Sequence, residues 1–188
     1  LRNSLDRPTT VSAFQPELKD VSNEANRFSG RFEGDSRIPG LMADLAARWL
    51  AAGDHQLALD YGSRVLTAPT ASPAERYAAW QVMARIRQEE GDYGLAERAW
   101  GQALNLAESE RLANVTEEQV SAIRKQLATS VYRQAELAVS SGRLGEAVGH
   151  FRRVDSVLPG SDVAIRARYD AANTLLKASD WSAAVGDL

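Results

Sequence analysis

Apolar residues recur near the start of the chain at steps of four and three, which is the spacing of one face of an α-helix. The run consists of Phe14, Leu18, Val21, Ala25, Phe28 and Phe32. Gly34 follows it and suits a helix end. We therefore expect a helix over residues 14–34 that packs on the following segment, while a dimerising coiled coil is the alternative interpretation. Residues 1–13 lack this periodicity and are predicted to form a flexible arm.

Small residues at fixed offsets from a turn mark a repeat in the rest of the chain. In each case an alanine lies seven residues before a glycine, or a serine in its place, and another alanine lies five residues after it. The sets are Ala46/Gly53/Ala58, Ala84/Gly91/Ala96, Ala135/Gly142/Ala147 and Ala172/Ser179/Ala184. Small residues on both sides of a turn allow two antiparallel helices to approach closely. The recurrence predicts an all-α fold built from repeated helix pairs.

Helix start signals place the boundaries of these repeats. Ser72, Pro73 and Glu75 form a predicted N-cap, first-turn proline and capping-box acid, and Thr116 with Gln119 has the pattern of a second capping box. The predicted repeats cover about 36–70, 73–114, 116–159 and 161–188, the last being incomplete.

The spacing between the turns is uneven. Gly53 and Gly91 are 38 positions apart (91 − 53), whereas Gly91 and Gly142 are 51 apart (142 − 91). A long unstructured connection is uncommon inside a compact domain. We therefore expect longer helices on both sides of Asn114, with the first helix of the third repeat running from about Glu117 to Ser141.

Composition narrows the range of functions. The 188 residues carry a net charge of −3, and nucleic-acid binding is not expected because such proteins usually show a basic excess. No apolar run approaches the roughly 20 residues that cross a bilayer, so membrane insertion is not expected either. The chain has no cysteine and therefore no disulfide or thiolate chemistry. Because it begins at Leu1 and stops at Leu188 within a predicted helix, we expect a fragment of a longer protein.

Residues that carry catalytic or metal chemistry show no matching pattern. His55 and His150 belong to different repeats and to no spaced ligand motif. The adjacent glutamates of each pair, 89 with 90 and 117 with 118, diverge by about 100° on a helix, so neither pair easily shares a substrate or metal. We predict no enzymatic activity, no cofactor, no metal ligands and no catalytic residues.

Four tryptophans invite comparison with an aromatic ligand cage. They are Trp49, Trp80, Trp100 and Trp181. Their helical spacing, with small residues opposite, favours packing between helices instead. On this interpretation, Trp80→Ala is expected to unfold the repeats.

The second repeat resembles the tetratricopeptide repeat (TPR) family. The resemblance rests on Trp80, Ala84, Gly91, Asp92, Tyr93, Ala96, Trp100 and Ala103. The other repeats keep part of the pattern: Ala46, Trp49, Gly53, Asp54 and Ala58; Ala135, Gly142, Ala147, Phe151 and Pro159; and Ala172, Asp180, Trp181 and Ala184. The resemblance spans residues 36–188 and implies a right-handed α-α superhelix, a TPR-like solenoid of antiparallel helix pairs.

In that family, the first helices of successive repeats line a concave groove that receives a peptide or a partner helix. The corresponding residues of this chain are Gln81, Arg85, Gln88, Tyr132, Arg133, Glu136, Arg166, Tyr169 and Asn173. The resemblance implies a non-enzymatic scaffold for protein–protein interaction, with a protein or peptide partner. Tyr132 and Tyr169 also fit ordinary packing between repeats.

Two alternatives to this function remain at the level of the sequence. The unfinished repeats and the face from Phe14 to Phe32 also suit a self-associating structural segment, and the chain also suits a regulatory arm of an enzyme whose catalytic domain lies elsewhere. The stretch from Leu158 to Ala172 is similar to repeats of bacterial periplasmic proteins of outer-membrane assembly and envelope division. This similarity implies a periplasmic or cell-envelope location, with the cytoplasm as the alternative.

Overall fold

The part of the chain that the structure describes is mainly helical. A computed structural model describes residues 10–109, 112 and 115–178, and side chains from residue 16 onward within these ranges. They form eight α-helices and no strand, so the predicted all-helical class is confirmed for them. The helices are α1 (Thr10–Arg31), α2 (Ile38–Ala51), α3 (His55–Thr67), α4 (Pro73–Glu89), α5 (Tyr93–Ser109), α6 (Glu117–Ser140), α7 (Leu144–Val157) and α8 (Asp162–Lys177).

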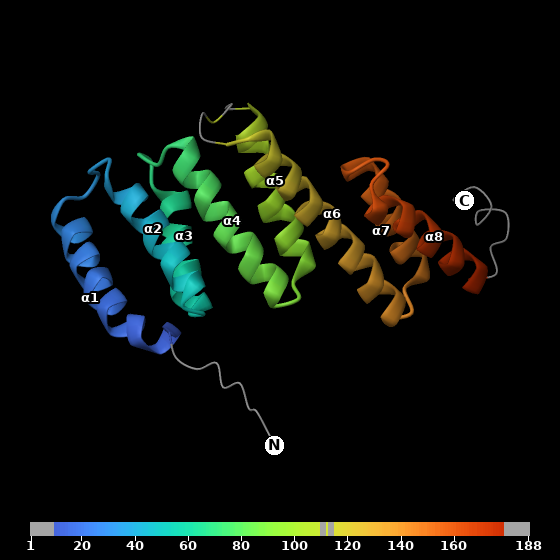
Figure 1. Ribbon diagram of the computed structural model, residues 1–188, viewed down its shortest axis with the longest axis horizontal. Helices are drawn as coiled ribbons and strands as arrows, with labels where there is room; N and C mark the ends of the chain where they lie inside the picture. The colour runs from blue at the N-terminus through green and yellow to red at the C-terminus, as the bar shows by residue number, and fades with distance from the viewer. Residues whose placement is uncertain (1–9, 110–111, 113–114, 179–188) are drawn as a thin grey trace, which may run out of the picture. The chain divides into compact units, whose positions relative to one another are not determined.

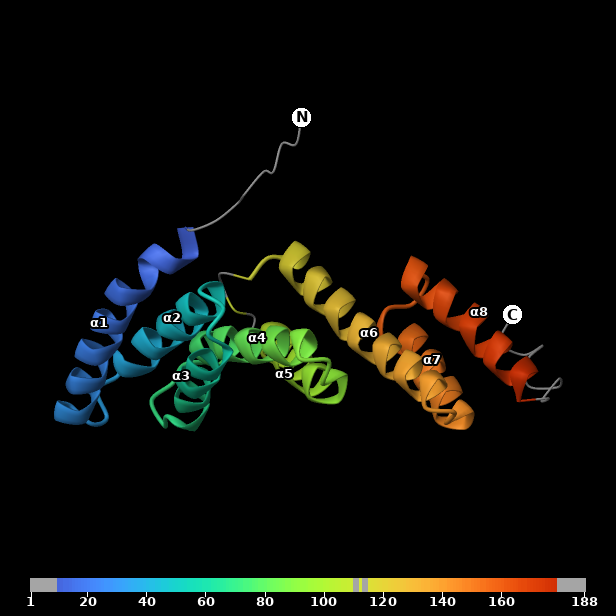
Figure 2. The same cartoon turned by 90° about the horizontal axis from the view of Figure 1, so that it is seen from below.

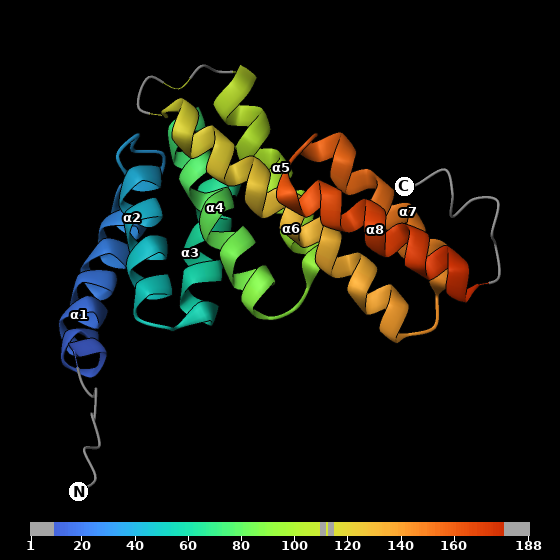
Figure 3. The same cartoon turned by 45° about the vertical axis from the view of Figure 1, so that its right-hand side comes forward.

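The helices belong to two compact units, which are described separately. The N-terminal unit lies within Leu1–Val82, and the C-terminal unit lies within Met83–Leu188. In the N-terminal unit, α2 packs against both α1 and α3 (Figures 1 and 2). In the C-terminal unit, α6 contacts α5, α7 and α8, and the last three helices lie side by side (Figure 3).

The same hydrogen-bonded turn follows α2, α4 and α6. At its centre Gly53, Gly91 and Gly142 have φ angles of 77°, 79° and 72°. In the first turn, the Gly53 N–H donates to the Leu50 carbonyl and the Asp54 N–H donates to the Trp49 carbonyl. The turns at the other two glycines have the same pair of hydrogen bonds. This is the Schellman helix end, in which a left-handed residue satisfies carbonyls that the helix leaves unpaired. The predicted glycine turns are confirmed at these three positions.

A Cβ added at Gly142 would meet no atom within 4 Å, so a side chain there has no steric clash. The left-handed backbone is then the only source of a cost. Gly142→Ala should therefore lower the free energy of unfolding by about 1 kcal/mol through backbone strain alone. Gly149, inside α7, is equally free of neighbouring atoms. Gly149→Ala should raise the free energy of unfolding by about 0.5–1 kcal/mol because a helix interior favours alanine. Urea unfolding of both variants checks the pair, and two changes of the same sign would contradict it.

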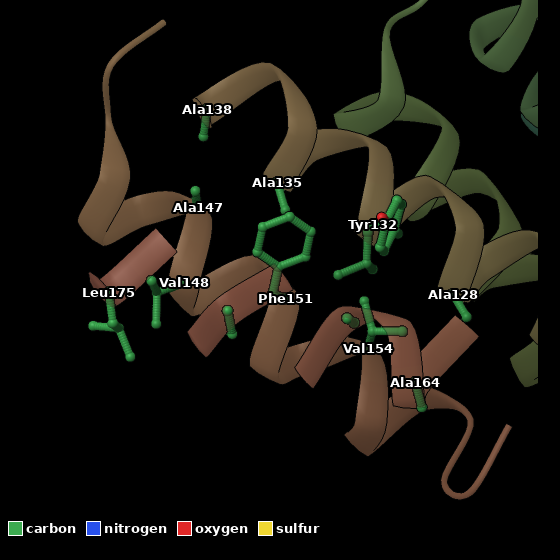
Figure 4. Close-up of a cluster of buried hydrophobic side chains, with 13 residues drawn as sticks. Ala128, Tyr132, Ala135, Ala138, Ala147, Val148, Phe151, Val154, Ala164 and Leu175 are labelled. Atoms are coloured by element: carbon green, nitrogen blue, oxygen red, sulfur yellow. The ribbon is translucent and has the colours of Figure 1, made fainter. Parts of the chain in front are cut away.

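Alanines on both sides of these turns are fully buried. Ala46 and Ala58 around the first turn are 0% exposed, as are the corresponding pairs around the other two. In Figure 4, Ala138 of α6 is directed toward Ala147 of α7 across the helix pair. A methyl group at these positions lets the backbones approach, as the sequence pattern predicts. Ser179 and Ala184 of the fourth set lie outside the described residues.

The predicted helix starts are confirmed at two capping boxes. The Ser72 N–H donates to the Glu75 carboxylate at 2.6 Å, and the Glu75 N–H donates back to the Ser72 hydroxyl at 3.3 Å. Thr116 and Gln119 exchange the same pair of bonds at the start of α6. That helix ends at Ser140, one residue before the predicted end.

The predicted packing face of the N-terminal helix is confirmed at Leu18 and Ala25 but not at Val21 and Phe32. The helix begins at Thr10, within the predicted arm, and it buries Leu18, Ser22 and Ala25. Val21 and Phe32, which the apolar pattern assigns to the packing face, are 51% and 46% exposed. The side chain of Phe14 is not among those described.

Polar side chains extend the packing face of α1. Ser22 accepts a hydrogen bond from the buried Trp49 indole at 3.0 Å. One turn later, Asn26 donates to the Tyr61 hydroxyl at 3.2 Å and accepts from Arg64 at 2.7 Å. These bonds connect α1 to α2 and α3 on a face that hydrophobicity alone does not identify.

The tryptophans differ in burial. Trp49 and Trp100 are 1% and 3% exposed, which agrees with a packing role. Trp80 is only partly buried, so the expected unfolding by Trp80→Ala rests on a burial that the structure does not show. Trp181 lies outside the described residues.

Candidate functional site

A groove in the C-terminal unit runs between α6 and α8. Two adjoining cavities of about 600 and 690 Å³ share Tyr132, Glu136 and Arg166 as lining residues. One continues toward Asn173 and Lys177 near the end of α8. The other continues toward Lys125 on α6 and the loop before α8, which contributes Leu158, Gly160 and Ser161. Together the cavities form one surface, which we call the α6–α8 groove.

The floor of this groove is aromatic. Tyr132 is 6% exposed, and its ring meets the Phe151 ring of α7 in an edge-on contact with centroids 5.3 Å apart. Figure 4 shows these two rings within a cluster of buried alanines, valines and a leucine. The cluster holds Tyr132 by packing, so its ring is a rigid part of the floor.

Hydrogen bonding fixes the polar end of Tyr132. Its hydroxyl donates to the Asp170 carboxylate of α8. The guanidinium of Arg166 lies 5.4 Å from the centre of the Tyr132 ring and 3.8 Å from the Asp170 carboxylate. Because Arg166 and Asp170 are four residues apart on one helix face, α8 presents both groups to the same ring.

Charges along the rim are mostly paired. Arg133 and Glu136 form an ion pair at 2.6 Å, and Asp170 is shared by Tyr132 and Arg166. Lys125 and Lys177 line the two cavities without an ion pair among the described residues. The groove therefore offers two exposed ammonium groups at its ends and an apolar floor.

Burial raises the pKa of the Tyr132 phenol, and the hydrogen bond to Asp170 raises it further. A phenol in an unfolded chain ionises near pH 10. Above that pH the unfolded chain releases a proton that the folded chain retains, so the free energy of unfolding should fall as pH rises. Tyr132→Phe has no phenol and should lose less stability between about pH 9 and pH 11. Urea unfolding across this range checks the prediction, and equal slopes for both proteins would contradict it.

The residues predicted for a groove are not all brought together. Tyr132, Arg133, Glu136, Arg166 and Asn173 line the α6–α8 groove. Tyr169 is 60% exposed and lines neither cavity.

The three predicted residues of α4 have other surroundings. Gln88 accepts a hydrogen bond from the buried Trp100 indole at 3.1 Å and donates to Gln126, so it connects α4 with α5 and α6. Arg85 is exposed, and Gln81 belongs to the N-terminal unit.

The sequence pattern leaves several groove residues unidentified. It marks Phe151 only as part of the repeat, and it gives no site role to Asp170, Lys125 or Lys177. The four-residue step from Arg166 to Asp170 is a signal that could have identified Asp170. Nothing in the local sequence predicts that Phe151, from a different helix, forms the floor.

Other chemistry is limited in the described part of the chain. There, no three histidine, cysteine, aspartate or glutamate residues gather as a metal site would require. No described helix combines the length and apolar character needed to cross a bilayer. His150 is 3.6 Å from Glu146 and 3.1 Å from Arg153, in a surface cluster. No known protein-family model matches the chain, and comparison with curated proteins finds no significant match.

Proposed function

We propose that the chain is a non-enzymatic protein-interaction module that binds a short segment of a partner protein in the α6–α8 groove. The observation that carries this proposal is the rigid aromatic floor of Tyr132 and Phe151 between charged rims. A floor that packing already holds in place loses little conformational entropy on binding, and the surrounding polar groups can orient a peptide backbone.

We further propose that the helices form a TPR-like right-handed solenoid. Three identical Schellman turns, each between fully buried alanines, support this arrangement. So does the resemblance of the second repeat to the family pattern. In such a solenoid α6 and α8 are first helices of successive repeats, which would place their groove on the concave surface.

The length and charge of the groove indicate which segment suits it. From Lys125 to Val139, α6 rises about 21 Å at 1.5 Å per residue. An extended peptide of about six residues has the same length. The exposed ammonium groups of Lys125 and Lys177 favour carboxylates near the two ends of such a segment, and the floor favours an apolar side chain between them.

A displayed library of random peptides tests this function directly. We expect selection on the purified chain to enrich short segments with an apolar centre and acidic flanks. Arg166→Glu should weaken their binding at least about tenfold, which corresponds to about 1.4 kcal/mol. Arg98→Glu, an equal charge reversal on the exposed face of α5, is the matched control and should leave affinity unchanged.

Circular dichroism must first show that both variants remain folded. Peptides that bind Arg166→Glu as tightly as the unmodified chain would contradict the proposal, and so would a selection that enriches nothing. A periplasmic or cell-envelope location remains a prediction from the stretch between Leu158 and Ala172.

A further inference from the structure

An exposed apolar stripe lies on α1, outside the groove already described. Val21 and Phe32 are 51% and 46% exposed, and Phe28 is partly buried. The Phe28 and Phe32 rings are 4.9 Å apart. With Leu41 of α2, Val21 and Phe28 line a surface hollow of about 450 Å³. This stripe is beside the buried face of α1, so the contacts of α1 with α2 and α3 leave it uncovered.

A cation lies near each of the two rings. The Arg37 guanidinium lies 5.3 Å from the centre of the Phe28 ring and is bound to Asp35 at 2.7 Å. The Arg31 guanidinium lies 5.6 Å from the centre of the Phe32 ring. Each of these contacts stabilises the observed ring position only modestly, as is usual at exposed sites.

Charges beside the stripe are separated by sign along the helix. Glu17, Asp20, Glu24, Arg27 and Arg31 follow one another at steps of three, four, three and four, which places them on one helix face. The first three, toward the N-terminus, are acidic, and the last two are basic. All five are exposed.

The outer four charges of this pattern are complementary to themselves when reversed, whereas Glu24, at the centre, faces its own copy. We propose that α1 is a self-association surface, on which the α1 helix of a second copy of this chain lies antiparallel about a two-fold axis near Glu24. Glu17 then faces Arg31 of the second copy, Asp20 faces Arg27, and Val21 faces Phe28. In a two-fold interface each of these contacts occurs twice, once in each direction between the copies.

A parallel arrangement is disfavoured by the same charges, because it sets acid against acid and base against base. The pair formed by Glu24 and Arg27 within one copy has side chains 70% and 76% exposed, so exchanging it for the contact between Arg27 and Asp20 costs little. The two Glu24 carboxylates then face each other at the axis, and this contact weakens the association. The apolar area is small, and the association should therefore be weak and concentration-dependent. It is independent of peptide binding in the α6–α8 groove.

Charge-reversal variants of the full chain test the proposal by sedimentation equilibrium. One variant carries Glu17→Lys, Asp20→Lys and Glu24→Lys, and the other carries Arg27→Glu and Arg31→Glu. The unmodified chain should associate as its concentration rises, and each variant alone should have a dissociation constant at least about tenfold higher. Mixing the two variants should restore association, because the reversed halves again face opposite charges.

Single cysteines test the antiparallel orientation, since the chain has no cysteine of its own. Glu24→Cys should join to itself through a short thiol crosslinker. Glu17→Cys should join to Arg31→Cys but not to itself, because about 21 Å of helix separates the two positions. Crosslinking of Glu17→Cys to itself would establish a parallel pair and overturn the proposal.

The apolar contribution is tested separately with Val21→Ser, which changes a half-exposed side chain and should leave the helical circular dichroism signal unchanged. It should raise the dissociation constant severalfold. A chain that remains monomeric at all concentrations would overturn the proposal, as would variants that associate as well as the unmodified chain. Retained peptide binding by the two charge-reversal variants would show that the groove functions separately.

Discussion

Trp49→Ala is expected to lower the free energy of unfolding of the N-terminal unit by roughly 3–5 kcal/mol, the usual cost of truncating a buried tryptophan. The side chain is 1% exposed, and its indole N–H donates to the Ser22 hydroxyl, which is itself buried. Truncation therefore opens a cavity and removes a hydrogen bond that connects α1 to α2. Because small domains are stable by only about 5–15 kcal/mol, much of this unit's stability depends on one residue.

Urea unfolding followed by circular dichroism measures this effect without relying on tryptophan fluorescence. Trp80→Ala is the matched control, because it removes the same atoms from a side chain that is only partly buried. We expect a clearly smaller loss of stability in that variant. Equal losses would show that exposure does not distinguish the two tryptophans.

Phe151→Ala is expected to have an effect of similar size in the C-terminal unit, again about 3–5 kcal/mol. Phe151 is 3% exposed and contacts the Tyr132 ring from below the groove. Its loss should destabilise the unit and loosen Tyr132, so peptide affinity should fall even under conditions in which the variant remains folded. Phe151→Leu keeps most of the apolar volume and should cost less than about half as much.

The edge-on contact between the rings can be separated from general packing by a double-mutant cycle. Phe151→Leu and Tyr132→Leu, alone and together, should give a coupling of about 0.5–1.5 kcal/mol, which is typical of aromatic pairs. Additive effects would mean that the two rings contribute to stability independently. The groove floor would then not act as one unit.

The turns and the alanines are the features that the sequence predicted best, for a local reason. Gly53, Gly91 and Gly142 adopt a backbone conformation that strongly favours glycine, and their flanking alanines fill positions where larger side chains would separate the helices. Both requirements are set within a few residues of chain. A pattern in the sequence can therefore reveal them without knowledge of the tertiary structure.

The face of α1 is predicted only in part, at Leu18 and Ala25, because the rest of its packing depends on partners far away in the sequence. Ser22 accepts from the Trp49 indole, and Asn26 bonds to Tyr61 and Arg64. Hydrophobic periodicity identifies neither polar residue, and it adds Val21 and Phe32, which are exposed. Hydrogen bonds between helices cannot be read from the sequence of one helix alone.

The groove is predicted only in part, because some of its residues come together through contacts between helices. Arg166 and Tyr132 were selected from their positions in the repeat, and both line the cavity. Phe151 and Asp170 complete the site through contacts between helices, which spacing within a single helix does not encode. Tyr169 was selected as well, but its direction on α8 places it outside both cavities.

The central proposal is that a partner segment lies between α6 and α8. Backbone amide chemical shifts, recorded by NMR during titration with a selected peptide, test it most directly. We expect the largest changes along residues 125–139 and 166–177, with smaller changes at the floor on α7. The largest changes in α1, α2 or α3, or an even spread over all helices, would contradict binding in the groove.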